Sequence, residues 1–151
     1  MSKMLQCLSM MAIIGTVVVG SSEPTKAGNL PARAGKNDWP VSEPYCWGYN
    51  GPTIQNNCSQ GKYWYMPLVN VGAGWFWITV TAQGASYSNN VQCISTGASS
   101  DGTIVYQSGW FALSQFGAAR DINLSTFVPS GGTADASCYV LPGGKLHTLN
   151  W

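Results

Sequence analysis

The sequence predicts an all-β fold, an antiparallel β-sandwich of the jelly-roll or Ig-like kind with about seven to eight short strands. Short runs rich in Val, Ile, Thr and aromatic residues recur after residue 62, and segments rich in Gly, Ser and Asn separate them. No long stretch has the apolar period of an amphipathic helix, and the one helical candidate, residues 114–120, makes at most one or two turns. Four cysteines in the same region are typical of a secreted domain stapled by disulfides.

Residues 1–27 have the layout of a secretory signal peptide. Residues 8–19 read LSMMAIIGTVVV, an uncharged apolar run between a weakly positive start and small residues. The run is shorter than the about 20 residues that a membrane-spanning helix needs, and no later segment is predicted to span a membrane. Cleavage after Gly20, Ser21 or Ala27 fits the pattern, and Ala27 is favoured; a buried core helix and an uncleaved anchor are the alternatives. The expected location is secreted and extracellular, or the periplasm or cell envelope.

Residues 28–37, which read GNLPARAGKN, are expected to form a flexible leader, followed by a single β-sandwich domain over residues 38–151. Residues 38–60 are rich in turn residues and are predicted to be irregular and pinned by their cysteines. Gly109 marks a candidate bulge, and Pro142-Gly143-Gly144 indicates a hairpin turn. Strands are predicted at residues 63–71, 75–82, 91–96, 103–107, 110–114, 122–128, 137–141 and 145–150.

The four cysteines of the domain predict two disulfides, and three pairings are open. We favour Cys46–Cys58, which would staple a loop with few apolar residues, and Cys93–Cys138, which would tie a middle strand to a late one. A four-cysteine zinc site is the alternative, but the sequence lacks the close C-x₂-C pair that such sites use. We therefore predict no metal and no cofactor.

The balance of charged residues excludes one class of binding partner. Residues 28–151 carry five basic and five acidic side chains and are neutral overall, so no basic stripe is available to neutralise phosphates and nucleic acid is not an expected partner. Charged residues make up 9% of the chain, against a usual figure of about 25%. A surface built from uncharged polar residues repels other copies weakly, so self-association is an open alternative.

Residues 75–82, WFWITVTA, carry the strongest functional signal. Alternate side chains of a strand face opposite sides, so the apolar even-numbered residues would face the core, and Trp75 and Trp77 would face away from it. If the turn at residues 71–74 pairs Asn70 with Trp75, then Trp64 joins the two tryptophans on the outer face. This register is an assumption, and a shift of one residue would exchange the faces of residues 63–69.

Two interpretations of this aromatic face are open. In one, a loop covers it, such as the segment that carries Trp39, Tyr45, Trp47 and Tyr49. In the other, part of it is exposed as a flat platform, on which sugar rings stack through their apolar C–H faces. A protein contact is a further alternative. The candidate ligand-binding residues are Trp64, Trp75 and Trp77, with Trp47 and Tyr49 as a second wall.

Signatures of catalysis are sparse. His147 is the only histidine, and across the predicted turn it would pair with Val140 as a packed or edge residue. The acidic residues have no spacing that indicates the two carboxylates of a glycosidase, and nucleophile-elbow, nucleotide-binding and zinc-protease motifs are absent. The sequence therefore favours a secreted non-catalytic binding domain, with a glycan first among ligands and a cell-surface or protein partner second. A structural or self-associating envelope protein is the main alternative, and a small hydrolase or inhibitor is the least favoured.

Overall fold

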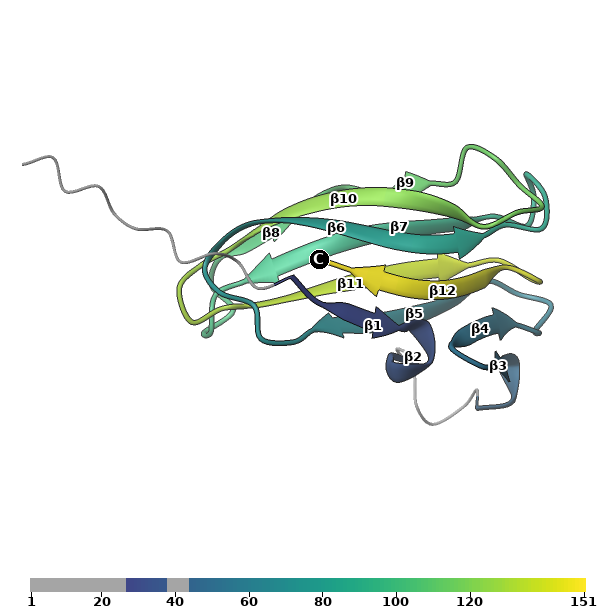
Figure 1. Cartoon of the computed structure of the whole chain (residues 1–151), viewed down its shortest axis with the longest axis horizontal. Helices are drawn as coiled ribbons and strands as arrows, with labels where there is room; N and C mark the ends of the chain where they lie inside the picture. Colours follow the sequence, from purple (N-terminus) through teal and green to yellow (C-terminus); the bar gives the residue numbers. More distant parts are fainter. Residues whose placement is uncertain (1–26, 38–43) are drawn as a thin grey trace, which may run out of the picture.

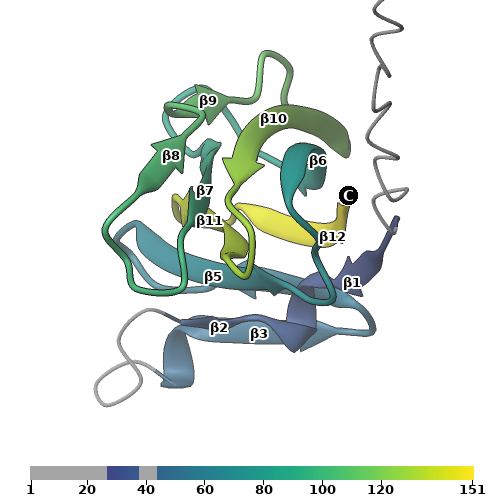
Figure 2. The ribbon, with the colours of Figure 1, turned by 90° about the vertical axis from the view of Figure 1, so that its left-hand side faces the viewer.

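The computed structural model describes residues 27–37 and 44–151 (Figure 1). Residues 1–26 of the predicted signal peptide lie outside the described residues, and so does Trp39. Two antiparallel sheets of six strands each pack face to face as a β-sandwich (Figure 2). The predicted fold class is confirmed, with more strands than expected because several are only two to four residues long.

The front sheet faces the viewer in Figure 1. Its strand order is β10 (Arg120–Val128), β6 (Gly74–Gln83), β12 (Lys145–Asn150), β4 (Thr53–Asn56) and β3 (Trp47–Asn50), and β1 (Asn29–Pro31) also pairs with β12. The back sheet has the order β2 (Lys36–Asn37), β5 (Lys62–Leu68), β11 (Thr133–Val140), β7 (Val91–Ala98) and β8 (Val105–Gln107), with β9 (Phe111–Ala112) paired to β7. Two single-turn 3₁₀ helices, η1 (Ala32–Ala34) and η2 (Pro44–Cys46), complete the described elements.

The core lies between the two sheets and follows the period of two in the long strands. On β6 the even-numbered residues from Phe76 to Ala82 are buried, and on the neighbouring β10 the even-numbered residues from Ile122 to Val128 are buried. From the back sheet, β11 contributes its even-numbered residues from Ala134 to Val140, and β5 contributes Trp64, Met66 and Leu68. Because each long strand buries one face, its other face is left for solvent or for a ligand.

Both predicted hairpins are wrong. β5 and β6 lie in different sheets, and so do β11 and β12, so the turns at residues 71–74 and 142–144 carry the chain from one sheet to the other. β6 pairs instead with β10 and β12, which come later in the sequence. In a sandwich, successive strands can bury their apolar faces against each other across the core without sharing backbone hydrogen bonds.

The expectation of a flexible leader at residues 28–37 is also wrong. β1 pairs with the end of β12, and the backbones of Gly28 and Trp151 exchange two hydrogen bonds, of 2.7 and 3.0 Å. Ala32 of η1 is fully buried, and its carbonyl accepts a hydrogen bond of 2.8 Å from Trp64 Nε1. The sequence does not reveal these strands, because they are too short to show a period of two and because Gly28, Pro31 and Gly35 are typical of loops.

Three local expectations are corrected as well. Residues 47–56 form the β3–β4 hairpin rather than irregular structure, with Gly51 in its turn at a φ of 59°. Residues 114–119 form no helix, and Arg120 already belongs to β10. Gly109 lies in the connection between β8 and β9, whereas the register shift that marks a bulge occurs on β12, between Leu146 and Thr148.

The favoured disulfide pairing is confirmed. Cys46–Cys58 closes the segment that holds the β3–β4 hairpin. Cys93 and Cys138 lie directly opposite each other on β7 and β11, with their Cα atoms 4.1 Å apart, and both are fully buried in the core. With all four thiols in disulfides, the zinc alternative is excluded for these cysteines.

Asn56 is a fully buried polar residue whose side chain makes three hydrogen bonds. Its Nδ2 donates to the carbonyls of Gln60 and Val140 at 2.8 and 2.7 Å, and its Oδ1 accepts from the backbone N–H of Cys58 at 2.9 Å. Its backbone also bonds to Gly143 and Gly144. One side chain thus joins β4, the Cys58 loop and β11, and every hydrogen-bonding atom of its amide has a partner.

β7 and β10 approach each other closely where the two sheets meet at one edge. A Cβ atom on Gly97 would lie 2.2 Å from the carbonyl oxygen of Phe127, so only glycine fits there. Ser95 Oγ donates to the carbonyl of Ser125 at 3.2 Å, and Thr126 Oγ1 donates to that of Tyr106 at 3.0 Å. These contacts hold β10 against β7, and β10 pairs in turn with β6.

Within the described chain, no helix has the length and hydropathy needed to cross a membrane.

Candidate functional site: an aromatic platform on the front sheet

Trp75 and Trp77 project from the outer face of β6 and are 63% and 78% exposed. The residues between and beyond them on the strand, Phe76 and Ile78, are buried. The orientation predicted for residues 75–82 is therefore confirmed. Two side chains two positions apart on a strand lie about 7 Å from each other, so the two indoles form neighbouring parts of one surface.

Phe127 extends this surface on the adjacent strand β10. It lies directly opposite Trp75, and the two ring centroids are 5.7 Å apart in an edge-to-face arrangement. Tyr106 of β8 also packs edge-to-face against Phe127, with ring centroids 5.2 Å apart. Ser125, opposite Trp77, is too small to cover the indole. We call Trp75, Trp77 and Phe127 the platform.

Sequence reasoning missed Phe127, although a signal for it was present. In residues 122–128, INLSTFV, the even-numbered residues are the buried set, so Phe127 falls on the same side as the polar Asn123 and Ser125. A large aromatic residue on the polar side of a strand is the same feature that singled out Trp75 and Trp77.

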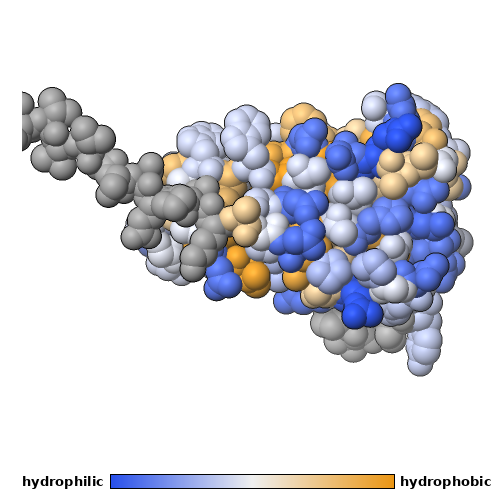
Figure 3. Space-filling view, in the orientation of Figure 1, coloured by the Kyte–Doolittle hydropathy of each residue, from blue (hydrophilic) through white to orange (hydrophobic). Residues whose placement is uncertain are grey.

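A polar strip continues from the platform along the front sheet. Thr79 Oγ1 donates to Asn123 Oδ1 at 3.1 Å, and Thr81 Oγ1 donates to Asp121 Oδ1 at 2.8 Å. On the other side of β6, Asn150 and Thr148 of β12 pair with the same two threonines. Hydrophilic residues run through the middle of this face and gather at its right-hand end in Figure 3. Hydroxyl, amide and carboxylate groups thus lie within reach of any ligand stacked on the platform.

Trp64 and Trp47 are not part of the platform. β5 belongs to the back sheet and turns its even-numbered residues inward, so Trp64 is only 2% exposed. Trp47 is 5% exposed and packs against Trp64 with ring centroids 4.7 Å apart. The face assignment for residues 63–69 was therefore reversed, because the assumed hairpin with β6 does not exist. Both tryptophans belong to the core.

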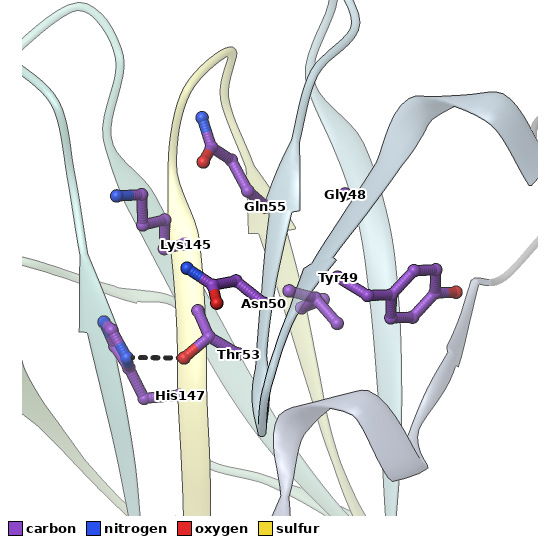
Figure 4. Close-up of a pocket in the computed structure, with 8 residues that line it drawn as sticks. Gly48, Tyr49, Asn50, Thr53, Gln55, Lys145 and His147 are labelled. Atoms are coloured by element: carbon purple, nitrogen blue, oxygen red, sulfur yellow. Dashed lines mark hydrogen bonds between the residues drawn. The ribbon is translucent and has the colours of Figure 1, made fainter.

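Tyr49 is 62% exposed, but it lies beyond β12 and β4 and not beside the platform. It helps to line a pocket of about 250 Å³ on the outer side of β3, β4 and β12. The other lining residues are Gly48, Asn50, Thr53, Ile54, Gln55, Lys145 and His147 (Figure 4). Sequence reasoning did not find this pocket, because its two halves come from residues 48–55 and 145–147.

His147 lies in this pocket and does not pair with Val140 as predicted, since β11 and β12 are in different sheets. Its Nδ1 is 3.0 Å from Thr53 Oγ1, and its Nε2 is buried without a hydrogen-bond partner. Burial, and then the nearby charge of Lys145, lower the pKa of His147. Within the described residues its partner is a threonine rather than a carboxylate, so a Ser-His-Asp arrangement does not form there.

Asp101 has a structural role in the turn after β7. It accepts hydrogen bonds from Ser99 Oγ, Thr103 N and Thr103 Oγ1 at 2.6, 3.1 and 2.9 Å. These bonds, that from Ser99 first, lower the pKa of Asp101 to about 2. Among the residues that the structure covers, no group of three metal-ligating side chains comes together.

No known protein family and no curated protein matches the sequence. Solved structures do match. The chain shares its β-sandwich fold with a carbohydrate-binding module, the C-terminal CBM6 of LamC, a marine laminarinase from Zobellia galactanivorans. The TM-score is 0.50 at 12% sequence identity, over 83% of this chain and 98% of that one. A family two carbohydrate esterase from Cellvibrio japonicus matches with a TM-score of 0.51 and 12% identity, over 83% of this chain but 33% of that longer one.

Proposed function

We propose that the protein is a secreted, non-catalytic carbohydrate-binding domain, and that Trp75 and Trp77 bind the ligand. The observation that carries this proposal is the exposure of two neighbouring indoles, 63% and 78%, on a strand that is paired on both sides within the front sheet. Soluble domains rarely leave such a surface bare without a use for it. The fold shared with a CBM6 of a laminarinase supports a glycan as the ligand.

The chemistry of the face suits a sugar. An indole offers a flat apolar surface that gives up little conformational freedom on binding, and sugar rings have apolar C–H faces of similar size. The strip formed by Thr79, Thr81, Asn123 and Asp121 supplies donors and acceptors for hydroxyl groups. Because β6 is paired on both sides, the platform is already in its binding geometry and little ordering is needed when the ligand arrives.

The decisive experiment is polysaccharide pull-down and glycan-array binding with the double variant Trp75→Ala/Trp77→Ala. If stacking on each indole contributes about 1.4 kcal/mol, the double variant loses roughly 100-fold in affinity. Its thermal stability should stay within a few degrees of wild type, because the removed rings are mostly exposed.

Trp110→Ala is the matched control. Trp110 is 47% exposed but lies beside β9, away from the platform. Its ring centroid is 6.2 Å from that of Tyr63 of the back sheet. This variant should bind like wild type. Absence of glycan binding by wild type, or equal binding by wild type and the double variant, would refute the proposal.

Self-association is the second candidate, and the same surface favours it. The platform is apolar, and the charges of residues 28–151 balance, so two copies would meet without electrostatic repulsion. Sedimentation of wild type and Trp75→Ala/Trp77→Ala at increasing concentration separates the two candidates. A dimer that the substitutions dissolve would identify the platform as a subunit interface.

Secretion is part of the proposal. Two disulfides in a domain of this size are typical of an oxidising compartment outside the cytosol. We expect residues 1–27 to act as the signal peptide, and the intact mass of the exported protein should correspond to a chain that begins at Gly28. Retention of the apolar run at residues 8–19 in the exported protein would contradict this assignment.

A further inference from the structure

The pocket beside β12 is lined by His147, which lies at the bulge in the pairing of β12 with β6. Up to Leu146, β12 pairs with β4; after the register shift it leaves β4 and pairs with β1 instead. Bulges of this kind redirect a side chain and often occur next to functional sites. The pocket is a space of about 250 Å³ on the outer side of the front sheet, between β12 and the β3–β4 hairpin. Such a volume is smaller than the about 300–1,000 Å³ of pockets for drug-sized ligands, and it suits a group the size of one sugar ring.

The pocket lies on the same face as the platform and some distance from it. Lys145 pairs with Gln83, which has the same parity on β6 as Trp75 and Trp77 and therefore points to the same side. Gln83 is six residues beyond Trp77, a distance of about 20 Å along a strand. The pocket is thus a separate site, reached from the platform along the polar strip.

The charge of the pocket is positive. Lys145 and His147 line it, and Arg33 of η1 lies close by, with its Nη1 3.5 Å from the carbonyl of Gly51 in the β3–β4 turn. Among the described residues no carboxylate lines the pocket, and Asp121 lies two strands away from β12, across β6. An anionic group would therefore be attracted to this pocket without having to displace an acidic side chain.

The hydrogen-bonding groups point to the kind of anion. In the tautomer in which Nδ1 accepts a hydrogen bond from the Thr53 hydroxyl, Nε2–H is buried and has no acceptor among the described residues. Figure 4 shows Lys145, Asn50 and Thr53 around the His147 ring, with the Tyr49 ring turned away. The amides of Asn50 and Gln55 offer both donors and acceptors, the combination that neighbouring hydroxyl groups require.

We propose that this pocket binds the carboxylate of an acidic sugar, with Lys145 Nζ holding the carboxylate, the His147 ring beside it gaining a positive charge as the pH falls, and Asn50 and Gln55 holding ring hydroxyls. The choice of a sugar as the carrier of the carboxylate rests on the proposed function, whereas the choice of a carboxylate rests on the pocket alone. The protein would then bind an acidic sugar of a glycan in the pocket and stack neutral sugar rings on the platform.

The test uses His147 itself, because it is the only histidine of the chain and gives a single set of imidazole signals. Tag-free protein is titrated from pH 8 to pH 5 by NMR with sodium glucuronate, galacturonate, glucose or acetate. In the free protein, burial and Lys145 lower the pKa of His147. A bound carboxylate favours the protonated ring and raises that pKa, so affinity for the uronates increases as the pH falls through the pKa of the complex. If binding raises the pKa of His147 by about one, the protonated protein binds the uronate about tenfold more tightly than the neutral protein.

Variants complete the test. Lys145→Gln and His147→Gln should each reduce uronate affinity at least fivefold, and Lys36→Gln, at the far edge of the back sheet, should leave it unchanged. Glucose that moves the His147 signals as strongly as glucuronate would overturn the choice of an anion, and acetate that does so would overturn the choice of a sugar. Uronate binding should survive Trp75→Ala/Trp77→Ala, so the failure of either site is seen separately.

Discussion

Replacing Cys93 and Cys138 together by alanine is expected to lower the free energy of unfolding by about 4 kcal/mol. The disulfide closes a loop with a sequence separation of 45 residues, and opening it gives the unfolded chain more freedom. Both sulfurs are in the core, between β7 and β11 and facing the front sheet, so their removal also loosens the packing. Urea unfolding followed by near-ultraviolet circular dichroism measures the change.

The second disulfide is the control for this prediction. Cys46–Cys58 has a sequence separation of 12 and lies at the edge of the sandwich, so the same chain-entropy estimate gives a loss of about 3 kcal/mol for Cys46→Ala/Cys58→Ala. The core pair should therefore destabilise more than the edge pair. The reverse order would mean that the β3–β4 hairpin contributes more to global stability than its position suggests.

Asn56→Ala is expected to destabilise the domain by about 3 kcal/mol, since it removes three hydrogen bonds at a fully buried position. The carbonyls of Gln60 and Val140 would lose a donor inside the protein, where water replaces it poorly. Thermal and urea unfolding should both show the loss. Hydrogen exchange should increase first around residues 56–60, because Asn56 holds the Cys58 loop against β11.

Asn123→Ala is the matched control for Asn56→Ala. Asn123 is also a strand asparagine of the front sheet, but it is exposed, and its amide oxygen accepts a hydrogen bond from Thr79 Oγ1, the one side-chain hydrogen bond of its amide among the described residues. Its loss should change the free energy of unfolding by less than about 1 kcal/mol. Equal effects of the two substitutions would show that burial of the Asn56 amide is not the source of its stabilisation.

The strands with one apolar and one polar face could be predicted from the sequence, and those with two apolar faces could not be oriented. β6 alternates cleanly beyond Trp77, so its buried set was identified correctly. On β5 the aromatic residues Tyr63, Trp64 and Tyr65 fall on both faces, and a period of two cannot decide between them. A hairpin between β5 and β6 would put Trp64 on the outer face, but the two strands lie in different sheets and Trp64 is buried.

The neighbours of the long strands β5 and β6 could not be predicted from the sequence, because these strands pair with strands that are far from them along the chain. β6 lies between β10 and β12, and β5 lies between β2 and β11. Phe127 joins Trp75 only through the β6–β10 pairing, and Lys145 meets Gln55 only through the β12–β4 pairing. The platform could therefore be predicted in part, from one strand, and the pocket could not.

The two backbone hydrogen bonds between Gly28 and Trp151 bring the first and last strands of the sandwich into one ladder. Residues 28 and 151 of the domain therefore lie next to each other in space. A short peptide linking Trp151 to Gly28 would allow the chain to be opened elsewhere, for example at the exposed turn around Gly102, without loss of a single β-ladder. Circular permutation is therefore a natural way to graft this sandwich onto another scaffold.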